Sequence, residues 1–360
     1  MIVLRVLLGL VGAVVIGLTV GSALRTVVLP RGVPATLGRV VFNAIREVYE
    51  LRMRRASSYE DRDAIMATYG PLSLLALLQV WLLLVWIGYT AIYAALGSGL
   101  VGALRESGSS LLTLGFDRPA GTGEVLVAFT EASTGLVLLA LLITYLPSLY
   151  AAFSRREAAV AKMAVRAGEP PSGVEMLVRA WSLGRGDLLN NVWTSWEDWF
   201  VDIEETHTSF PALSFFRSPQ SGQSWVTSAG AVLDGAALYA STVDAERDLD
   251  AELCLRAGYL ALRRIGAFFG LSFDADPSPE DAISVSRHEY DEAVQRLRDN
   301  GVPVRGDVDQ SWRDFAGWRV NYEPVLLGLA TLTMAPYALW SSDRSATFRR
   351  PPVFRLLRRR

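Results

Sequence analysis

Five consecutive residues, Thr113 to Asp117, form the segment whose types and spacing have the clearest chemical use. They read Thr113, Leu114, Gly115, Phe116 and Asp117. A threonine hydroxyl and a row of backbone carbonyls can replace the hydration shell of a cation. Gly115 permits the backbone angles that turn carbonyls toward one axis. A carboxylate at Asp117 would attract cations, so the pattern favours ion coordination by backbone.

A second cluster with possible chemistry consists of Glu204, Glu205 and His207. Glu204-x-x-His207 has the spacing of di-iron helix bundles, which need a second such pair. The other histidine, His288, has Val285 three residues before it, so no metal site is expected. We favour an aromatic core helix with a polar edge. A regulatory role stays open, because an acid beside a histidine can titrate near neutral pH. The aromatic residues are Trp193, Trp196, Trp199 and Phe200.

Signatures of enzymes and of nucleic-acid binding are missing from the sequence. It contains no phosphate-binding glycine loop, nucleophile elbow, zinc-protease motif or paired cysteines, since Cys254 is the only cysteine. We therefore expect no enzyme and no cofactor. The net charge of −2 gives no overall field that would attract nucleic acid.

The composition indicates a membrane protein. Hydrophobic residues make up 51% and charged residues only 20% of the 360 positions, below the roughly 25% charge of soluble domains. Three stretches lack any charge: 6–24, 64–104 and 132–154. Each can hold one helix of the roughly 20 apolar residues that cross a bilayer. We place the middle span at about 71–95.

The first charge-free stretch resembles a signal peptide in position, but its apolar core is long and no clear cleavage site follows, so an uncleaved span is favoured.

Orientation follows from the arginines. Eight arginines lie between the first two spans and only Arg105 and Arg118 between the next two. The positive-inside rule then predicts three spans in the plasma (inner) membrane, with the N-terminus and 96–124 outside and the C-terminal half cytoplasmic.

The connector between the first two spans has helical periodicity. Leu37, Val41, Ile45 and Val48 recur on one face with arginines between them. Such a helix either lies along the inner membrane surface or packs on the cytoplasmic domain, and the sequence favours neither.

A short helix over 100–112, followed by Thr113–Asp117, resembles the pore loop of the potassium-channel superfamily, whose filter reads T-V-G-Y-G-D. Residues 71–155 would then form outer helix, re-entrant helix, filter and inner helix. The resemblance implies a homotetramer around one axis, with K⁺ or Na⁺ as the permeant cation. In the inner helix it implies a hinge or gate at Gly135 and Pro147.

The resemblance departs from the family at its fifth position, where Asp117 replaces glycine and Arg118 follows. A ring of Asp117 carboxylates, partly neutralised by Arg118, predicts weakened K⁺/Na⁺ discrimination. If the third span begins near Val125, Glu131 lies less than two turns into it and either faces a cavity or reaches the outer interface. The alternative is that 96–124 is only an extracellular hairpin, and that the chain is a membrane-anchored binding or scaffold protein without conduction.

The C-terminal half predicts an all-α domain. Ser286-x-x-Glu289 is a capping box that opens a helix ending at Asn300-Gly301. A second short helix is expected to open at Ser278–Asp281. The apolar run 325–340 is too short to span, so we expect a buried or interfacial helix. The fold class is thus an all-α membrane protein with an N-terminal helix (1–30), a connector (31–70), the pore-loop module (71–155), a cytoplasmic domain (156–345) and an Arg-rich tail (346–360).

The tail mixes arginines with Phe348, Phe354, Leu356 and Leu357. It is expected to contact anionic headgroups at the inner leaflet, where each basic residue contributes about 1 kcal/mol. The alternative is a solvated tail. The lipid-contacting residues would be Arg349, Arg350, Arg355, Arg358, Arg359 and Arg360.

Overall fold

A computed structural model of the chain describes residues 2–29, 36–184 and 188–347. Within these residues the regular structure is helical, apart from one isolated antiparallel bridge between Val243 and Val304. The expected all-α class is confirmed. Three helical regions are long and apolar enough to cross a membrane: Ile2–Val27, Tyr59–Leu96 and Thr122–Ala167.

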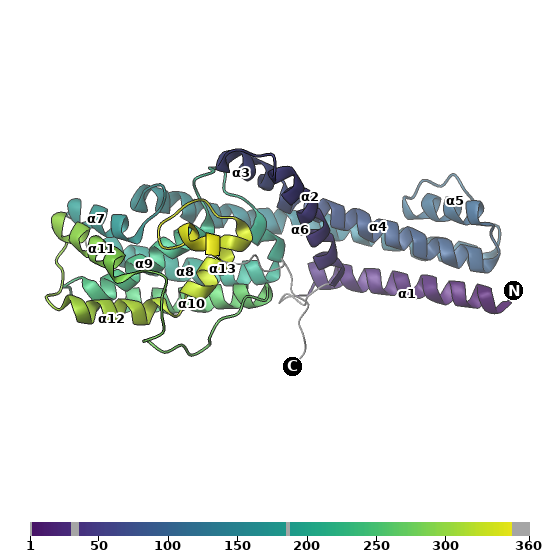
Figure 1. Cartoon of the computed structure of the whole chain (residues 1–360). Coiled ribbons are helices and arrows are strands. Elements are labelled where there is room, and N and C mark those ends of the chain that lie inside the picture. The colour runs from purple at the N-terminus through teal and green to yellow at the C-terminus, as the bar shows by residue number, and fades with distance from the viewer. Residues whose placement is uncertain (1, 30–35, 185–187, 348–360) are drawn as a thin grey trace. The chain divides into compact units, whose positions relative to one another are not determined.

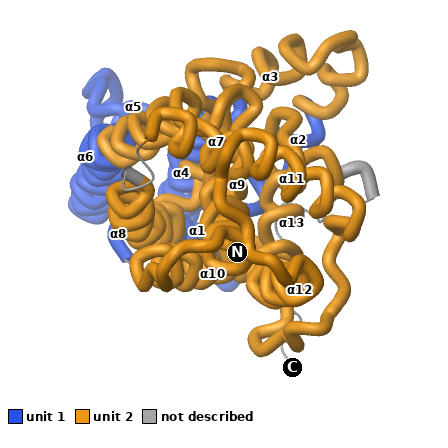
Figure 2. Tube along the Cα trace, turned by 90° about the vertical axis from the view of Figure 1, so that its left-hand side faces the viewer, with its two compact units in different colours: residues 1–48, 69–150 blue, residues 49–68, 151–360 orange. Residues whose placement is uncertain are grey.

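The chain forms two compact units, coloured separately in Figure 2. Unit 1 comprises 1–48 and 69–150, and unit 2 comprises 49–68 and 151–360. The connector expected as one segment at 31–70 is therefore divided between them. The third apolar helix contributes its first part to unit 1 and its last part to unit 2.

Unit 1 contains the apolar helices. Helix α1 (Ile2–Val27) packs along α4 (Tyr69–Leu96), and α5 (Leu100–Leu111) folds back beside the end of α4 (Figure 1). A β-carbon on Gly12 would collide with the carbonyl oxygen of Gly88, so these two glycines let α1 and α4 approach closely. Small residues at such a crossing are typical of membrane helix pairs.

The amphipathic connector is α2 (Thr36–Met53), as its periodicity predicted. It is followed by α3 (Tyr59–Ala67), which opens with a capping box of Ser58 and Asp61. The Tyr69 hydroxyl donates to the Phe42 carbonyl at 3.1 Å, which joins the start of α4 to α2 inside unit 1.

Unit 2 is a helical domain whose core is rich in aromatic side chains. Helix α8 (Leu188–Ser209) packs against α10 (Leu249–Phe268), and α9 (Trp225–Thr242), buried along most of its length, packs against α7, α10 and α12. Trp193, Trp196 and Phe200 of α8 are almost fully buried, as expected for an aromatic core helix. The remaining elements are α7 (Gly173–Ser182), η1 (Pro211–Phe215), α11 (Arg287–Asp299), α12 (Val308–Arg319), α13 (Glu323–Thr333) and η2 (Ser342–Thr347).

Two sequence expectations for unit 2 are confirmed and one is wrong. The Ser286–Glu289 capping box opens α11. The apolar run after residue 325 forms part of the buried helix α13, which ends at Thr333. Ser278–Asp281 opens no helix: the Asp281 N–H donates to the Ser278 carbonyl at 3.0 Å in an isolated turn. Turn chemistry there competes with helix initiation, because serine and aspartate side chains bond the nearby backbone.

Candidate functional site

The loop after α5 contains two residues with left-handed backbone. Thr113 has φ 55° and Gly115 has φ 70°. Gly115 adopts this angle without steric cost, whereas a β-branched threonine does so only where its surroundings hold it. Leu114 lies between the two left-handed residues, so the backbone changes direction twice within three residues.

The N–H groups of this loop point back to the end of α5. Those of Leu114 and Asp117 both reach Ser109, at its carbonyl oxygen (2.8 Å) and its hydroxyl (3.1 Å) respectively. The Thr113 N–H donates to the Ser110 carbonyl at 3.0 Å. The backbone donors of the loop are therefore largely used by α5.

The carbonyl groups of the loop differ from its N–H groups in their hydrogen bonding. Within the described part of the chain, no carbonyl oxygen from Thr113 to Asp117 accepts a hydrogen bond. The side chains of Leu114 and Phe116 are 60% and 58% exposed. The segment thus combines free acceptors with apolar side chains that the described residues leave more than half exposed.

Asp117 forms an ion pair, but not with its neighbour in sequence. Its carboxylate lies 3.3 Å from Nε of Arg105 on α5. The expected neutralising residue was Arg118. The helical turn of α5 instead brings a more distant arginine back to the loop end, which sequence adjacency does not reveal.

Glu131 lies on α6 (Thr122–Ala167) and is fully buried rather than at an interface. The Ser107 hydroxyl, from α5, is 2.5 Å from its Oε1 and 3.1 Å from the carbonyl oxygen of Trp86 on α4. Glu131 therefore faces α5, the helix that precedes the loop.

Gly135 and Pro147 have different surroundings on α6. A β-carbon on Gly135 would lie 2.5 Å from the carbonyl oxygen of Leu111, so the glycine allows α6 to touch the end of α5. Pro147 lies inside α6, which continues as helix past it to Ala167. Their roles as hinge and gate stay predictions.

The three residues of the candidate regulatory cluster point to different places. His207 is fully buried: its Nε2 lies 3.2 Å from Nη1 of Arg156 and its Nδ1 lies 3.0 Å from the Ile203 carbonyl. Glu204 pairs with Arg264, and Glu205 accepts from Ser209 at 3.2 Å. Burial lowers the pKa of His207 well below its ordinary value, and the Arg156 charge lowers it further.

Sequence reasoning missed Arg156, which follows the third apolar stretch. It is 1% exposed and donates to the carbonyl oxygens of Leu213 (2.9 Å) and Phe216 (2.7 Å). It also pairs with Glu157 at 2.8 Å. As one of several arginines behind a span it reads as an ordinary topology signal, so nothing in the pattern marks it as buried.

The predicted lipid-contacting arginines, 349 to 360, lie outside the described residues. Arg344, just before them, pairs with Glu289 of α11 at 2.5 Å and belongs to unit 2. The described residues contain no cluster of histidine, cysteine or acidic side chains arranged to hold a metal.

Comparisons with known proteins add no assignment. No protein-family model matches the chain, and neither a curated protein nor a solved structure does.

Proposed function

We propose that the chain is a subunit of a pore-loop cation channel, with Thr113–Asp117 as its ion-coordinating segment. The observation that carries the proposal is the division of hydrogen bonding in this loop: its donors are turned to α5 and its carbonyls are left free. A cation passing through a membrane needs oxygen ligands in place of water. Non-helical backbone at membrane depth needs such a water-filled or protein-covered setting.

Four copies would complete the site, because one loop supplies carbonyls on one side of an ion only. The exposed side chains of Leu114 and Phe116 support contact with further copies, as does exposed Phe129 on α6. The proposal is therefore a homotetramer in the inner membrane, with lipids as its other partners and unit 2 on the cytoplasmic side.

Selectivity would depend on how far Asp117 keeps its charge at the pore mouth. Arg105, paired with it at 3.3 Å, lowers the field that a ring of four carboxylates would otherwise create. K⁺ or Na⁺ is the proposed permeant ion, with weaker discrimination between them than a glycine at this position would allow.

Reconstituted vesicles test the proposal directly. The wild type should conduct K⁺ or Na⁺ and show fourfold symmetry in detergent. Gly115→Ala should abolish flux, because alanine is strained at φ 70°. Gly102→Ala is the matched control, since a β-carbon there meets nothing within 4 Å.

Asp117 gives a second measurement. Asp117→Asn should reduce cation entry, and Asp117→Gly should raise K⁺ preference in bi-ionic reversal potentials. A monomer without flux would replace the proposal by the membrane-anchored scaffold. A channel in which Gly115→Ala conducts as the wild type does would show that Thr113–Asp117 does not coordinate the ion.

A further inference from the structure

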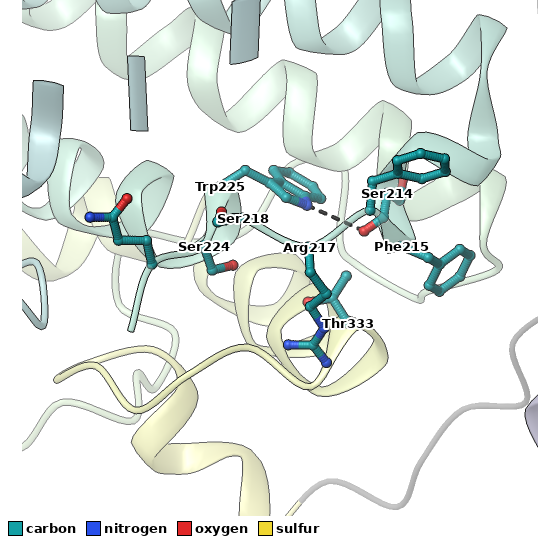
Figure 3. A pocket seen from close by; sticks show the side chains of 9 residues that line it. Ser214, Phe215, Arg217, Ser218, Ser224, Trp225 and Thr333 are labelled. Carbon is teal, nitrogen blue, oxygen red and sulfur yellow. Dashed lines mark hydrogen bonds between the residues drawn. The ribbon is translucent and has the colours of Figure 1, made fainter. Parts of the chain in front are cut away.

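A small pocket in unit 2 has unused polar groups on its wall. It lies between the segment after η1, the start of α9 and the end of α13, and nine residues line it (Figure 3). Ser214 and Ser218 are 1% and 9% exposed, and neither hydroxyl has a hydrogen-bond partner among the residues that the structure describes. Unpaired buried hydroxyls lower the stability of the folded protein, so such a pair indicates that a small ligand binds between them.

Further donors at the pocket come from the start of α9. Ser224 is the N-cap of α9, an 18-residue helix, and Trp225 is its first residue. The main-chain N–H of Trp225 makes no hydrogen bond within the described chain. Helix N-termini attract anions through such N–H groups and through the helix dipole.

Among the described residues that line the pocket, Arg217 is the charged one, and its guanidinium is paired with the Asp63 carboxylate at 2.9 Å. Two nearby acceptors are already in use: the Ser214 carbonyl takes the Trp225 indole N–H at 3.3 Å, and the Phe216 carbonyl takes Arg156. A cation would therefore find few free oxygen ligands, whereas an anion would find several donors.

The free volume of the pocket limits its ligand to a monoatomic ion or a water molecule. The free space is about 10 Å³, close to the minimum for one water molecule. Figure 3 shows Ser218 and Ser224 near the Trp225 indole, with Arg217 beside Thr333. A sulfate, phosphate or nucleotide does not fit this space.

We propose that this pocket binds chloride or a similar monoatomic anion. The hydroxyls of Ser214 and Ser218 and the N–H of Trp225 would donate to it, at the positive end of α9. The site is independent of whether the protein conducts ions. Occupancy would stabilise the segment 213–218, which bonds Arg156 of α6 on one side and Asp63 of α3 on the other.

Thermal unfolding of the full chain in detergent tests the site. The unfolding temperature of the wild type should be about 2–4 °C higher in sodium chloride than in sodium gluconate of equal ionic strength. The variant Ser214→Ala/Ser218→Ala should lose that increment while unfolding in gluconate no earlier than the wild type, because it removes two unpaired hydroxyls. The exposed Ser195→Ala is the control.

Chloride NMR line broadening gives a readout that does not depend on the variant. The wild type should broaden the signal saturably, and bromide but not gluconate should compete. Equal unfolding temperatures in the two salts, an increment that survives in the double variant, or no saturable broadening would each overturn the site and leave an ordinary bound water.

Discussion

The Arg217 guanidinium lies 2.9 Å from the Asp63 carboxylate, and it also donates to the main-chain oxygen of Met334 at 2.9 Å. Asp63 belongs to α3, which leads directly into α4. The preceding residue, Phe216, accepts from Arg156, on the part of α6 that lies in unit 2. Within unit 2, the consecutive residues Phe216 and Arg217 therefore connect the last part of α6, through Arg156, with the helix that precedes α4, through Asp63.

A double-mutant cycle on Arg217 and Asp63 should detect this link. Arg217→Met leaves a largely buried carboxylate without its cation and should lower the free energy of unfolding by about 3 kcal/mol. The double variant with Asp63→Asn should lose less than the two single losses combined, with a coupling of about 1–3 kcal/mol. Denaturant unfolding in detergent gives these values.

The exposed pair Arg287 and Asp309, at 2.7 Å, is the control for that cycle. Solvent screens it, so its coupling should stay below about 1 kcal/mol. Equal coupling energies in the two pairs would contradict the expectation that the buried Arg217–Asp63 pair contributes more to stability than an exposed pair does.

Gly135→Ala should separate α6 from the end of α5. Its β-carbon would fall 2.5 Å from the Leu111 carbonyl oxygen, which is main chain and cannot rotate away. Overpacking of this kind costs about 1–3 kcal/mol, so the unfolding temperature in detergent should fall. Gly102→Ala, where a β-carbon meets nothing within 4 Å, should not lower it, and a similar fall in both variants would show that the contact with Leu111 is not the cause.

Gly12→Ala should weaken the packing of α1 on α4, because its β-carbon would collide with the Gly88 carbonyl. Limited proteolysis between the two helices should become faster. Gly17→Ala changes the same helix where a β-carbon meets nothing within 4 Å, and should have no effect. Unchanged proteolysis in Gly12→Ala would show that the contact contributes little.

Acid should destabilise unit 2 through His207. Burial, and then the charge of Arg156, lower the pKa of this histidine in the folded protein, whereas the unfolded chain takes up a proton below about pH 6.5. The free energy of unfolding should therefore fall by about 1.4 kcal/mol for each pH unit below that value.

His207→Gln should flatten this pH dependence between about pH 6.5 and 5.5, since glutamine does not titrate. His288→Gln should not, because that side chain is 83% exposed on α11. A wild-type profile that is flat over this range would show that His207 is protonated in the folded state.

Local patterns predicted the elements that depend on local physics. Long charge-free stretches have few alternatives to a spanning helix, and the structure places apolar helices at all three. The Ser286–Glu289 capping box and the amphipathic periodicity of α2 also act within a few residues, and both helices are present. Ser278–Asp281 failed because the same side chains serve turns equally well.

Tertiary structure alone decided which polar groups are buried and what they meet. The sequence identified Glu131 and His207 as notable, but their partners Ser107 and Arg156 come from other helices. Arg319, which bonds Asp234 and Glu323 in the core of unit 2, looks like any surface arginine on an amphipathic helix. A buried charged side chain needs partners that satisfy it, and partners distant in sequence, such as Asp234 for Arg319, are brought close only by packing.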